Sequence, residues 1–223
     1  EKTVVELRGA VKRQERFVGS FAHEMKTPLT SILGFADILR LKKDVAESER
    51  QEYASIISEE ATRLKVLSSK LLELVTTNNQ MLEMRPVPLK ALFTDIWQSM
   101  QPVLARKKVS LIIEPSDLKL ICDKYLMSSM LYNLIDNAYK ASFENGIIYL
   151  KAYQIDQHMV LEVKDNGRGM SEETIRHALE PFYMEDKARS RKNGGSGLGL
   201  ALCAKIADAH HAKLYIESQL GKG

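Results

Sequence analysis

Hydrophobic side chains recur at three- and four-residue spacing in two long stretches near the start of the chain. The first stretch carries Phe17, Phe21, Met25, Leu29, Ile32, Phe35 (or Ala36) and Leu39. The second carries Tyr53, Ile57, Ala61, Leu64, Leu67, Leu71 and Leu74. This spacing predicts two amphipathic helices. The charged stretch RLKKDVAESER (40–50) between them predicts a polar turn, so the two helices should form a hairpin.

A hairpin of this kind buries its apolar stripe on one side only. Pairing with a second copy would complete the burial, so the pattern favours a homodimer joined through a four-helix bundle. Packing of the hairpin against the rest of the same chain is the alternative.

The pattern changes at MRPVPL (84–89), where Pro86 and Pro88 predict a short extended linker over 85–88. Helical and strand-like runs alternate beyond it. Helices are predicted over 89–108, 123–143 and 197–211. Strands are predicted over 109–115, 118–122, 146–155, 158–165 and 212–218. This mixture predicts an α/β sandwich with its helices on one face of a sheet.

Composition narrows the function classes. The hydrophobic fraction of 44% and the charged fraction of 27% are typical of a globular protein, and a net charge of +3 gives no reason to propose a nucleic acid partner. Cys122 and Cys203 lie far apart without metal-site spacing, which indicates buried free thiols in a reducing compartment. No apolar run reaches the ~18–20 residues that cross a bilayer. We expect a cytoplasmic location, with membrane attachment only through a sensor region absent from this chain.

The sequence NLIDNAYK places Asn133, Asn137 and Lys140 on one helical face, at i, i+4 and i+7. Carboxamide oxygens are hard ligands suited to Mg²⁺, and a neighbouring lysine can neutralise phosphate charge. A solvated polar face is the alternative interpretation of this stretch.

The sequence VKDNGRGM ends a β-rich run in Asp165, followed by Gly167 and Gly169. A carboxylate at a strand end can accept a hydrogen bond from an exocyclic amine such as that of adenine. Two glycines allow the backbone to approach a flat base closely. An ordinary Asn-Gly turn is the alternative.

The sequence GGSGLGLALCAKI leads glycines directly into an apolar helix, which makes an anion-binding cradle suited to a triphosphate. It is neither a Walker loop nor a Rossmann turn, because no Gly-Lys-Ser/Thr follows and no strand precedes it. The second part of the preceding segment EPFYMEDKARSRKN is polar and cationic, as in a lid that closes over phosphates, although a plain surface loop has the same composition.

Taken in order, these stretches resemble the N, G1, F and G2 boxes of the Bergerat-fold ATP-binding domain, over residues 86–223. The family includes histidine kinases, gyrase-type topoisomerases, Hsp90-type chaperones and MutL-type repair proteins. The resemblance implies bound ATP and Mg²⁺, with Asn137 on the metal, Asn133 as a second candidate ligand, and Asp165 on adenine beside Gly167 and Gly169. It implies further nucleotide contacts from Lys140, Phe182, Lys187, Arg189, Arg191, Gly195, Ser196, Gly197, Leu198, Gly199 and Leu200.

Asn133 distinguishes between the branches of this family. The gyrase, Hsp90 and MutL branches carry a glutamate four residues before the metal-binding asparagine, where it activates water. An amide cannot take a proton from water near neutral pH. The site therefore resembles one that holds ATP for transfer to another nucleophile.

The segment FAHEMKTPLTSILGF (21–35) resembles the H-box of dimeric sensor histidine kinases. His23 lies off the apolar stripe and should face solvent, with Glu24 beside it and Thr27 one turn on. The resemblance implies that His23 is the phosphoacceptor, Glu24 the general base, and Thr27 the residue that holds water in a phosphatase reaction. It implies a response-regulator receiver domain as partner. Pro28 lacks an N–H group and should bend the helix.

Together the two resemblances identify the chain as similar to the catalytic core of a two-component histidine kinase. We expect a signal-transmitting helix at 1–16, a dimerisation and phosphotransfer hairpin at 17–84, the linker at 85–88 and the ATP-binding domain at 89–223, with its last strand cut short. A Bergerat-fold ATPase or chaperone-like dimer and a degenerate docking module are the alternatives. One departure from the family is Ala212, which falls at a turn usually given to glycine.

Overall fold

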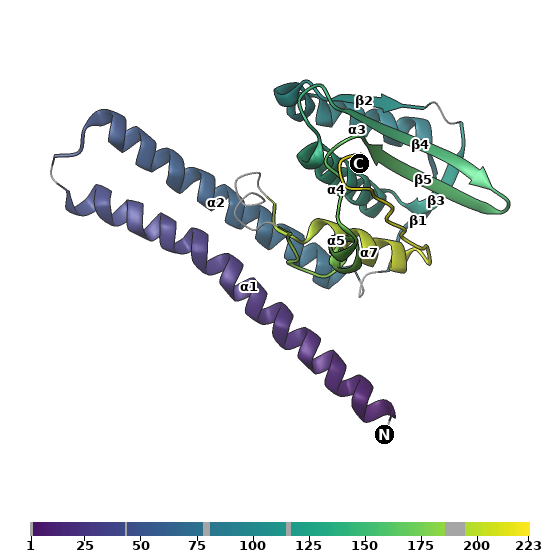
Figure 1. Ribbon diagram of the computed structural model, residues 1–223, viewed down its shortest axis with the longest axis horizontal. Coiled ribbons are helices and arrows are strands. Elements are labelled where there is room, and N and C mark those ends of the chain that lie inside the picture. The colour runs from purple at the N-terminus through teal and green to yellow at the C-terminus, as the bar shows by residue number, and fades with distance from the viewer. Residues whose placement is uncertain (1, 43, 78–80, 115–116, 186–194) are drawn as a thin grey trace. The chain divides into compact units, whose positions relative to one another are not determined.

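The computed structural model describes residues 2–42, 44–77, 81–114, 117–185 and 195–223 (Figure 1). The chain divides into two units. The first comprises Glu1–Leu72 and Asp186–Ser196, and the second comprises Glu73–Glu185 and Gly197–Gly223.

The first unit is built on a helical hairpin, which confirms the prediction from the apolar spacing. Helix α1 (Lys2–Leu41) and helix α2 (Glu47–Thr76) run in opposite directions on either side of a short turn (Figure 1). The rings of Phe35 on α1 and Tyr53 on α2 lie with their centroids 5.3 Å apart. Lys42, the residue after α1, forms an ion pair of 3.2 Å with Glu49 in the first turn of α2.

Pro28 lies inside α1 without ending it, and the helix continues on both sides. Glu24 and Pro28, one turn apart, are both buried. The Glu24 carboxylate approaches Arg63 of α2, so the side of α1 that faces α2 passes through Glu24. Leu29, which we placed on the inner stripe, is half exposed. The bend at Pro28 stays a prediction.

The second unit mixes strands and helices. Its strands are β1 (Met84–Pro88), β2 (Ser110–Ile113), β3 (Lys119–Asp123), β4 (Ile147–Ile155) and β5 (His158–Asp165). Its helices are α3 (Leu89–Leu104), a short 3-10 turn (Ala105–Lys107), α4 (Lys124–Ala141), α5 (Glu172–His177) and α7 (Gly199–Ala209).

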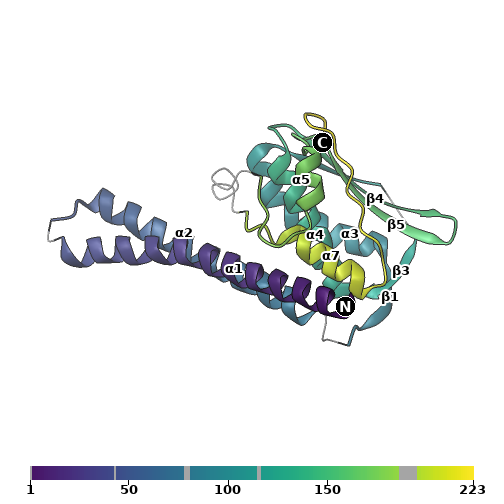
Figure 2. The ribbon, with the colours of Figure 1, turned by 60° about the horizontal axis from the view of Figure 1, so that its bottom comes forward.

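The strands form two small sheets. Strand β4 lies between β2, to which it is parallel, and β5, to which it is antiparallel. Strands β1 and β3 pair antiparallel in the other sheet. Helices α3, α4 and α7 cover one face of the strands, as Figure 2 shows. This confirms the predicted α/β sandwich.

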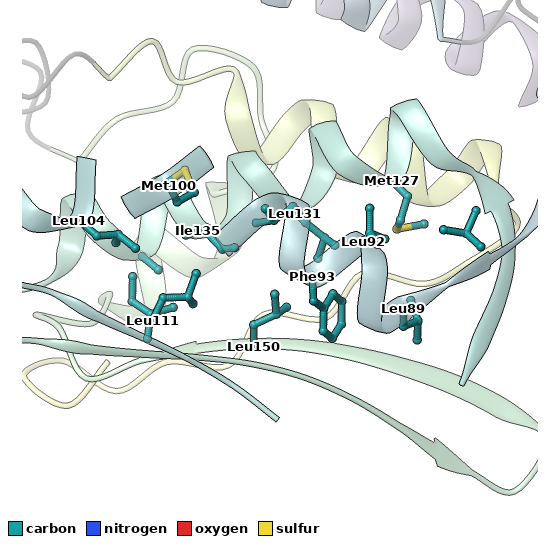
Figure 3. Close-up of a cluster of buried hydrophobic side chains, with 14 of the residues drawn as sticks. Leu89, Leu92, Phe93, Met100, Leu104, Leu111, Met127, Leu131, Ile135 and Leu150 are labelled. Atoms are coloured by element: carbon teal, nitrogen blue, oxygen red, sulfur yellow. The ribbon is translucent and has the colours of Figure 1, made fainter. Parts of the chain in front are cut away.

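The core fills the space between this helical layer and the sheet (Figure 3). Its fully buried side chains include Leu89, Leu92, Phe93, Leu131, Ile135, Ile148 and Leu150. These side chains come from α3, α4 and β4. Apolar burial of this extent holds α4 against the sheet. Helix α4 carries Asn133, Asn137 and Lys140.

Two predicted segments differ from the structure. Residues 85–88, predicted as a short extended linker, are extended, but together with Met84 they form strand β1, which pairs with β3. The prediction of a strand over 212–218 is wrong: these residues have no regular secondary structure. The short helix α5 was not foreseen.

Both cysteines are buried and free, as predicted. Burial, with a smaller contribution from the charge of Asp123, raises the pKa of the Cys122 thiol to about 11. Within the described residues, every helix falls short of the length or apolar character that a bilayer crossing requires.

Candidate functional site

Helix α4 positions the first group of candidate residues. Its amino end is capped by Asp123, whose Oδ1 accepts hydrogen bonds from the N–H groups of Tyr125 and Leu126. Asn133 is buried, and its Nδ2 donates to the carbonyl of Ser129 at 2.9 Å. That bond directs Asn133 Oδ1 away from the Ser129 carbonyl. The cap and this hydrogen bond therefore fix how the helix presents its polar face.

Asn137 follows one turn later, and the start of α7 lies close to both asparagines. A Cβ atom built on Gly199 would lie 3.3 Å from Asn133 Oδ1 and 3.4 Å from Asn137 Nδ2. Lys140, a further turn on, pairs with Asp136 at 2.7 Å. The structure therefore brings Asn133 and Asn137 close to Gly199, the first residue of α7.

The stretch DNGRG (165–169) begins at Asp165, the last residue of strand β5. Asp165 Oδ1 accepts a hydrogen bond of 2.8 Å from the N–H of Gly167. Arg168 N–H donates to the carbonyl of Ala141, at the end of α4. A Cβ on Gly167 would lie 2.6 Å from that carbonyl oxygen, so the loop needs glycine there to pass the helix end. Asp165 is thereby held beside the carboxyl end of α4.

Phe182 and Gly197 bracket the segment that we assigned as a lid. Phe182 is buried and adopts φ of 65°, an uncommon backbone conformation for a bulky residue. Its N–H donates to the carbonyl of Gly197 at 2.8 Å. A Cβ on Gly197 would lie 2.7 Å from Phe182 Cα, so these two residues need the close approach that glycine permits. Strained backbone of this kind is often found at ligand sites.

The remaining predicted nucleotide contacts fall into two groups. Lys187, Arg189 and Arg191 lie outside the described residues. Leu198 and Gly199 are buried, and the other members of the stretch are half-buried: Gly195, Ser196, Gly197 and Leu200. Gly169 is buried beside Gln219.

The H-box residues lie together on α1, in the first unit. The His23 side chain is 67% exposed, which confirms that it faces solvent. Its Nδ1 lies 3.9 Å from Oε1 of Glu24, whose side chain is 8% exposed. Thr27 Oγ1 donates to the main-chain carbonyl of His23 at 3.4 Å. The imidazole therefore has one nitrogen turned toward a buried carboxylate, and Nε2 lies on the opposite side of the ring.

Sequence reasoning missed three supporting residues: Arg63, Ser129 and Ala141. Arg63 could have been found from the hairpin itself. Phe35 lies beside Tyr53, so positions whose numbers add to about 88 face each other across the turn. That rule puts position 64 opposite Glu24, and Arg63 is the residue next to it. Ser129 and Ala141 contribute through their main-chain carbonyls. Every residue has such a carbonyl, so the pattern of side chains in the sequence could not predict these contacts.

The chemistry of the second unit fits a magnesium–nucleotide site. Asn137 Nδ2 is buried without a hydrogen-bond partner in the part of the chain that the structure describes. Rotation of this carboxamide places Oδ1 in the same space, where it suits Mg²⁺. The amino end of α7 opens onto the same asparagines, and a helix amino end favours phosphate. The asparagine oxygens thus fit the positive charge of Mg²⁺, and the amino end of α7 fits the negative charge of the phosphates.

Two family models match the chain. Residues 13–80 match the His Kinase A (phospho-acceptor) domain. Residues 122–223 match the model described as histidine kinase-, DNA gyrase B- and HSP90-like ATPase. The first match contains His23, and the second contains every nucleotide-site residue discussed above.

Curated relatives align with nearly all of the chain. It is 32% identical to the sensor histidine kinase YkoH of Bacillus subtilis, over 95% of this chain and 46% of YkoH. It is also 32% identical to the alginate biosynthesis sensor protein KinB of Pseudomonas aeruginosa, over 100% of this chain and 38% of KinB. The chain thus spans less than half the length of these two relatives.

Solved structures share the fold. The histidine kinase ThkA, in complex with the response regulator protein TrrA, is similar with a TM-score of 0.69 and 26% identity, over 93% of this chain and 60% of that chain. The Acinetobacter baumannii histidine kinase AdeS has a TM-score of 0.65 at 22% identity, over 84% of this chain and 86% of that chain. The second likeness supports the fold alone.

Proposed function

Because the chain belongs to the histidine kinase family, we propose that it transfers the γ-phosphoryl group of ATP to His23, and then to an aspartate on a response-regulator receiver domain. The observation that carries this proposal is the exposed His23 imidazole beside the buried Glu24 carboxylate. The ATPase-like match over the second unit supports ATP as the phosphoryl donor.

The geometry at His23 supports different tasks for the two ring nitrogens. Nδ1 faces Glu24, so Nε2 is the nucleophile. Nε2 attacks the γ-phosphorus, and a nitrogen–phosphorus bond forms. The bond to the β,γ-bridging oxygen breaks, and ADP leaves with that electron pair. The proton on Nδ1 passes to Glu24, which acts as the general base.

Asp165 would accept a hydrogen bond from the adenine amine through its second oxygen, since Oδ1 already accepts from Gly167. The stretch from Gly195 to Leu200 and the amino end of α7 would bind the phosphates. Asn137, with Asn133 beside it, would hold Mg²⁺, which neutralises phosphate charge when bound. Lys140 and the three lid cations, Lys187, Arg189 and Arg191, would add positive charge.

Asn133 favours transfer over hydrolysis. Its amide cannot act as a base toward water, and its Nδ2 is already engaged with the Ser129 carbonyl. Within this proposal the site holds ATP until His23 receives the phosphoryl group.

Transfer to the regulator breaks the nitrogen–phosphorus bond and forms an oxygen–phosphorus bond on an aspartate. ThkA, a similar kinase, has been solved in complex with the response regulator protein TrrA, which supports a receiver domain as the partner class. We further propose a phosphatase reaction toward that regulator, with Thr27 holding the attacking water one turn from His23.

We also propose that two copies pair through the hairpin. Leu29 is 50% exposed and Leu33 is 57% exposed on α1 of a single chain. A second hairpin would cover these side chains in a four-helix bundle. The phosphotransfer hairpin would span 17–84 and the ATP-binding domain 89–223, joined through 85–88, with residues 1–16 leading to a sensor region. We place this core in the cytoplasm.

Incubation of the chain with γ-labelled ATP and Mg²⁺ tests the function directly. We expect label on the protein that is lost in acid and kept in base, and none on His23→Gln. His158→Gln serves as the matched control, because His158 is exposed at the start of β5, outside the proposed H-box, and should leave the labelling stoichiometry unchanged.

The alternatives give different results in the same assay. Release of free phosphate without protein label would indicate a Bergerat-fold ATPase. Absence of ATP binding would indicate a docking module. Label on a side chain other than His23 would contradict the proposal.

A further inference from the structure

Four charged or titratable side chains form a line across the two helices of the hairpin. Glu24 Oε1 lies 3.9 Å from Nδ1 of His23, and Glu24 Oε2 lies 3.9 Å from Nη2 of Arg63. Nη1 of Arg63 lies 3.8 Å from Oε2 of Glu60. The guanidinium on α2 therefore stands between two carboxylates, one of which also faces the imidazole.

The Glu24 carboxylate is buried, and Arg63 supplies the positive charge that compensates it. The side chain of Glu24 is 8% exposed and that of Arg63 is 23% exposed. A carboxylate removed from water to this degree needs an opposite charge close by. Glu60 Oε2 is also buried and has no hydrogen-bond partner among the described residues, so its ion pair with Arg63 compensates it as well.

The two oxygens of Glu24 are divided between two partners. Arginine keeps its charge at all working pH values, and its planar group presents separate N–H donors at fixed angles. Because Arg63 engages Oε2, Oε1 is left on the side of His23. Attraction to the guanidinium thus favours the carboxylate orientation in which Oε1 lies toward His23.

We propose that Arg63 is a positioning residue for phosphoryl transfer, which holds Glu24 in the orientation that receives the Nδ1 proton of His23. Arg63 acts through Glu24 and does not touch the reacting atoms. Glu60 anchors the far side of the guanidinium. This inference rests on the proposed function, in which Glu24 is the general base.

The test compares Arg63→Met, which keeps length without charge, with Arg63→Lys, which keeps charge. General bases contribute about 10²–10⁴-fold to enzyme rates, so we expect Arg63→Met to lower the kcat of autophosphorylation about tenfold or more. The KM for ATP should stay within about twofold of the wild-type value, because Arg63 belongs to the hairpin. Arg63→Lys should recover most of the lost rate.

Arg50→Met is the matched control. Arg50 lies on the same helix and pairs with Glu47 at 3.8 Å, but both side chains are mostly exposed. We expect its kcat to equal that of the wild type. Helix content by circular dichroism and the oligomeric state should be the same for all three variants.

A double-mutant cycle separates positioning from a general structural role. In a Glu24→Gln background, Arg63→Met should cost less than about twofold, because the carboxylate that it positions is already gone. An equal cost in both backgrounds, or an unchanged kcat for Arg63→Met alone, would overturn the inference. Absence of label on the wild-type chain would instead overturn the proposed function.

Discussion

At the residue scale, the turn after α7 shows which position carries the backbone strain. The family resemblance directed attention to Ala212, where glycine is usual. The structure gives the left-handed conformation to His211, at φ of 54°, and not to Ala212. His211 N–H bonds the Asp208 carbonyl and Ala212 N–H bonds the Ala207 carbonyl, so the helix end is closed in the usual way.

We therefore expect His211→Gly to stabilise the second unit. Relief of the left-handed strain is worth about 1–2 kcal/mol, and the added freedom of the unfolded chain offsets about 0.4–1 kcal/mol. The midpoint of urea unfolding should rise. Ala212→Gly, the neighbouring control, should lower it, and the reverse order would show that the strain lies elsewhere.

Gly167 is a second residue whose size matters. It passes the Ala141 carbonyl so closely that a Cβ would have to displace the loop that carries Asp165. Its conformation is not left-handed, so space is the constraint here.

Gly167→Ala should weaken ATP binding about tenfold or more, because displacement of a binding group by about 1 Å has effects of that size or larger. Isothermal calorimetry with a non-hydrolysable nucleotide measures this. Gly34→Ala is the control: nothing lies within 4 Å of its Cβ position, and alanine in a helix is favoured over glycine by ~1 kcal/mol. Equal affinities for both variants would contradict the argument.

At the scale of elements, α1 carries both the proposed nucleophile and a proline. Pro28 supplies no N–H to the carbonyl of Glu24, the residue next to His23. Its ring is buried on the side of the helix that contains Glu24. A change at Pro28 therefore affects the backbone of the proposed general base directly.

Pro28→Ala restores that backbone donor and should make this turn of α1 more regular. We expect His23 to remain reactive, while the ratio of kinase to phosphatase rates shifts several-fold, because the two reactions need different placements of this turn. Both rates are measured with the labelled kinase and a labelled regulator. Identical rates in every assay would exclude a role for the proline.

At the scale of the whole molecule, exposed apolar side chains gather on the hairpin helices. Leu33, Leu41, Val66 and Leu72 are all exposed in the single chain. Large apolar side chains that stay exposed on both helices of one hairpin are candidates for an interaction surface. A second copy of the hairpin is the partner that we propose for it.

Leu33→Lys should weaken that association. Burial of each leucine contributes about 1.5–3 kcal/mol, and a symmetric dimer loses two, so the dissociation constant should rise about a hundredfold or more. Sedimentation equilibrium measures it. Leu220→Lys, at an exposed leucine of the second unit, should leave the dimer intact. A monomeric wild type would remove the basis of this prediction.

The sequence alone determined most of the elements and the chemical character of the site. Apolar periodicity located α1, α2, α4 and β5, because it reports directly which face of a local element is buried. The exposure of His23 followed from its place off that stripe. Motif order named the nucleotide-site residues, whose individual roles stay predictions.

Tertiary structure decided what depends on two distant segments meeting. The pairing of 84–88 with β3, and of Arg63 with Glu24, follows from the register between elements, which no single stretch encodes. Residues 212–218 have strand-like alternation but form no strand, because a strand needs a paired neighbour as well as a pattern. Periodicity is a local property, whereas pairing is settled by the packing of the whole chain.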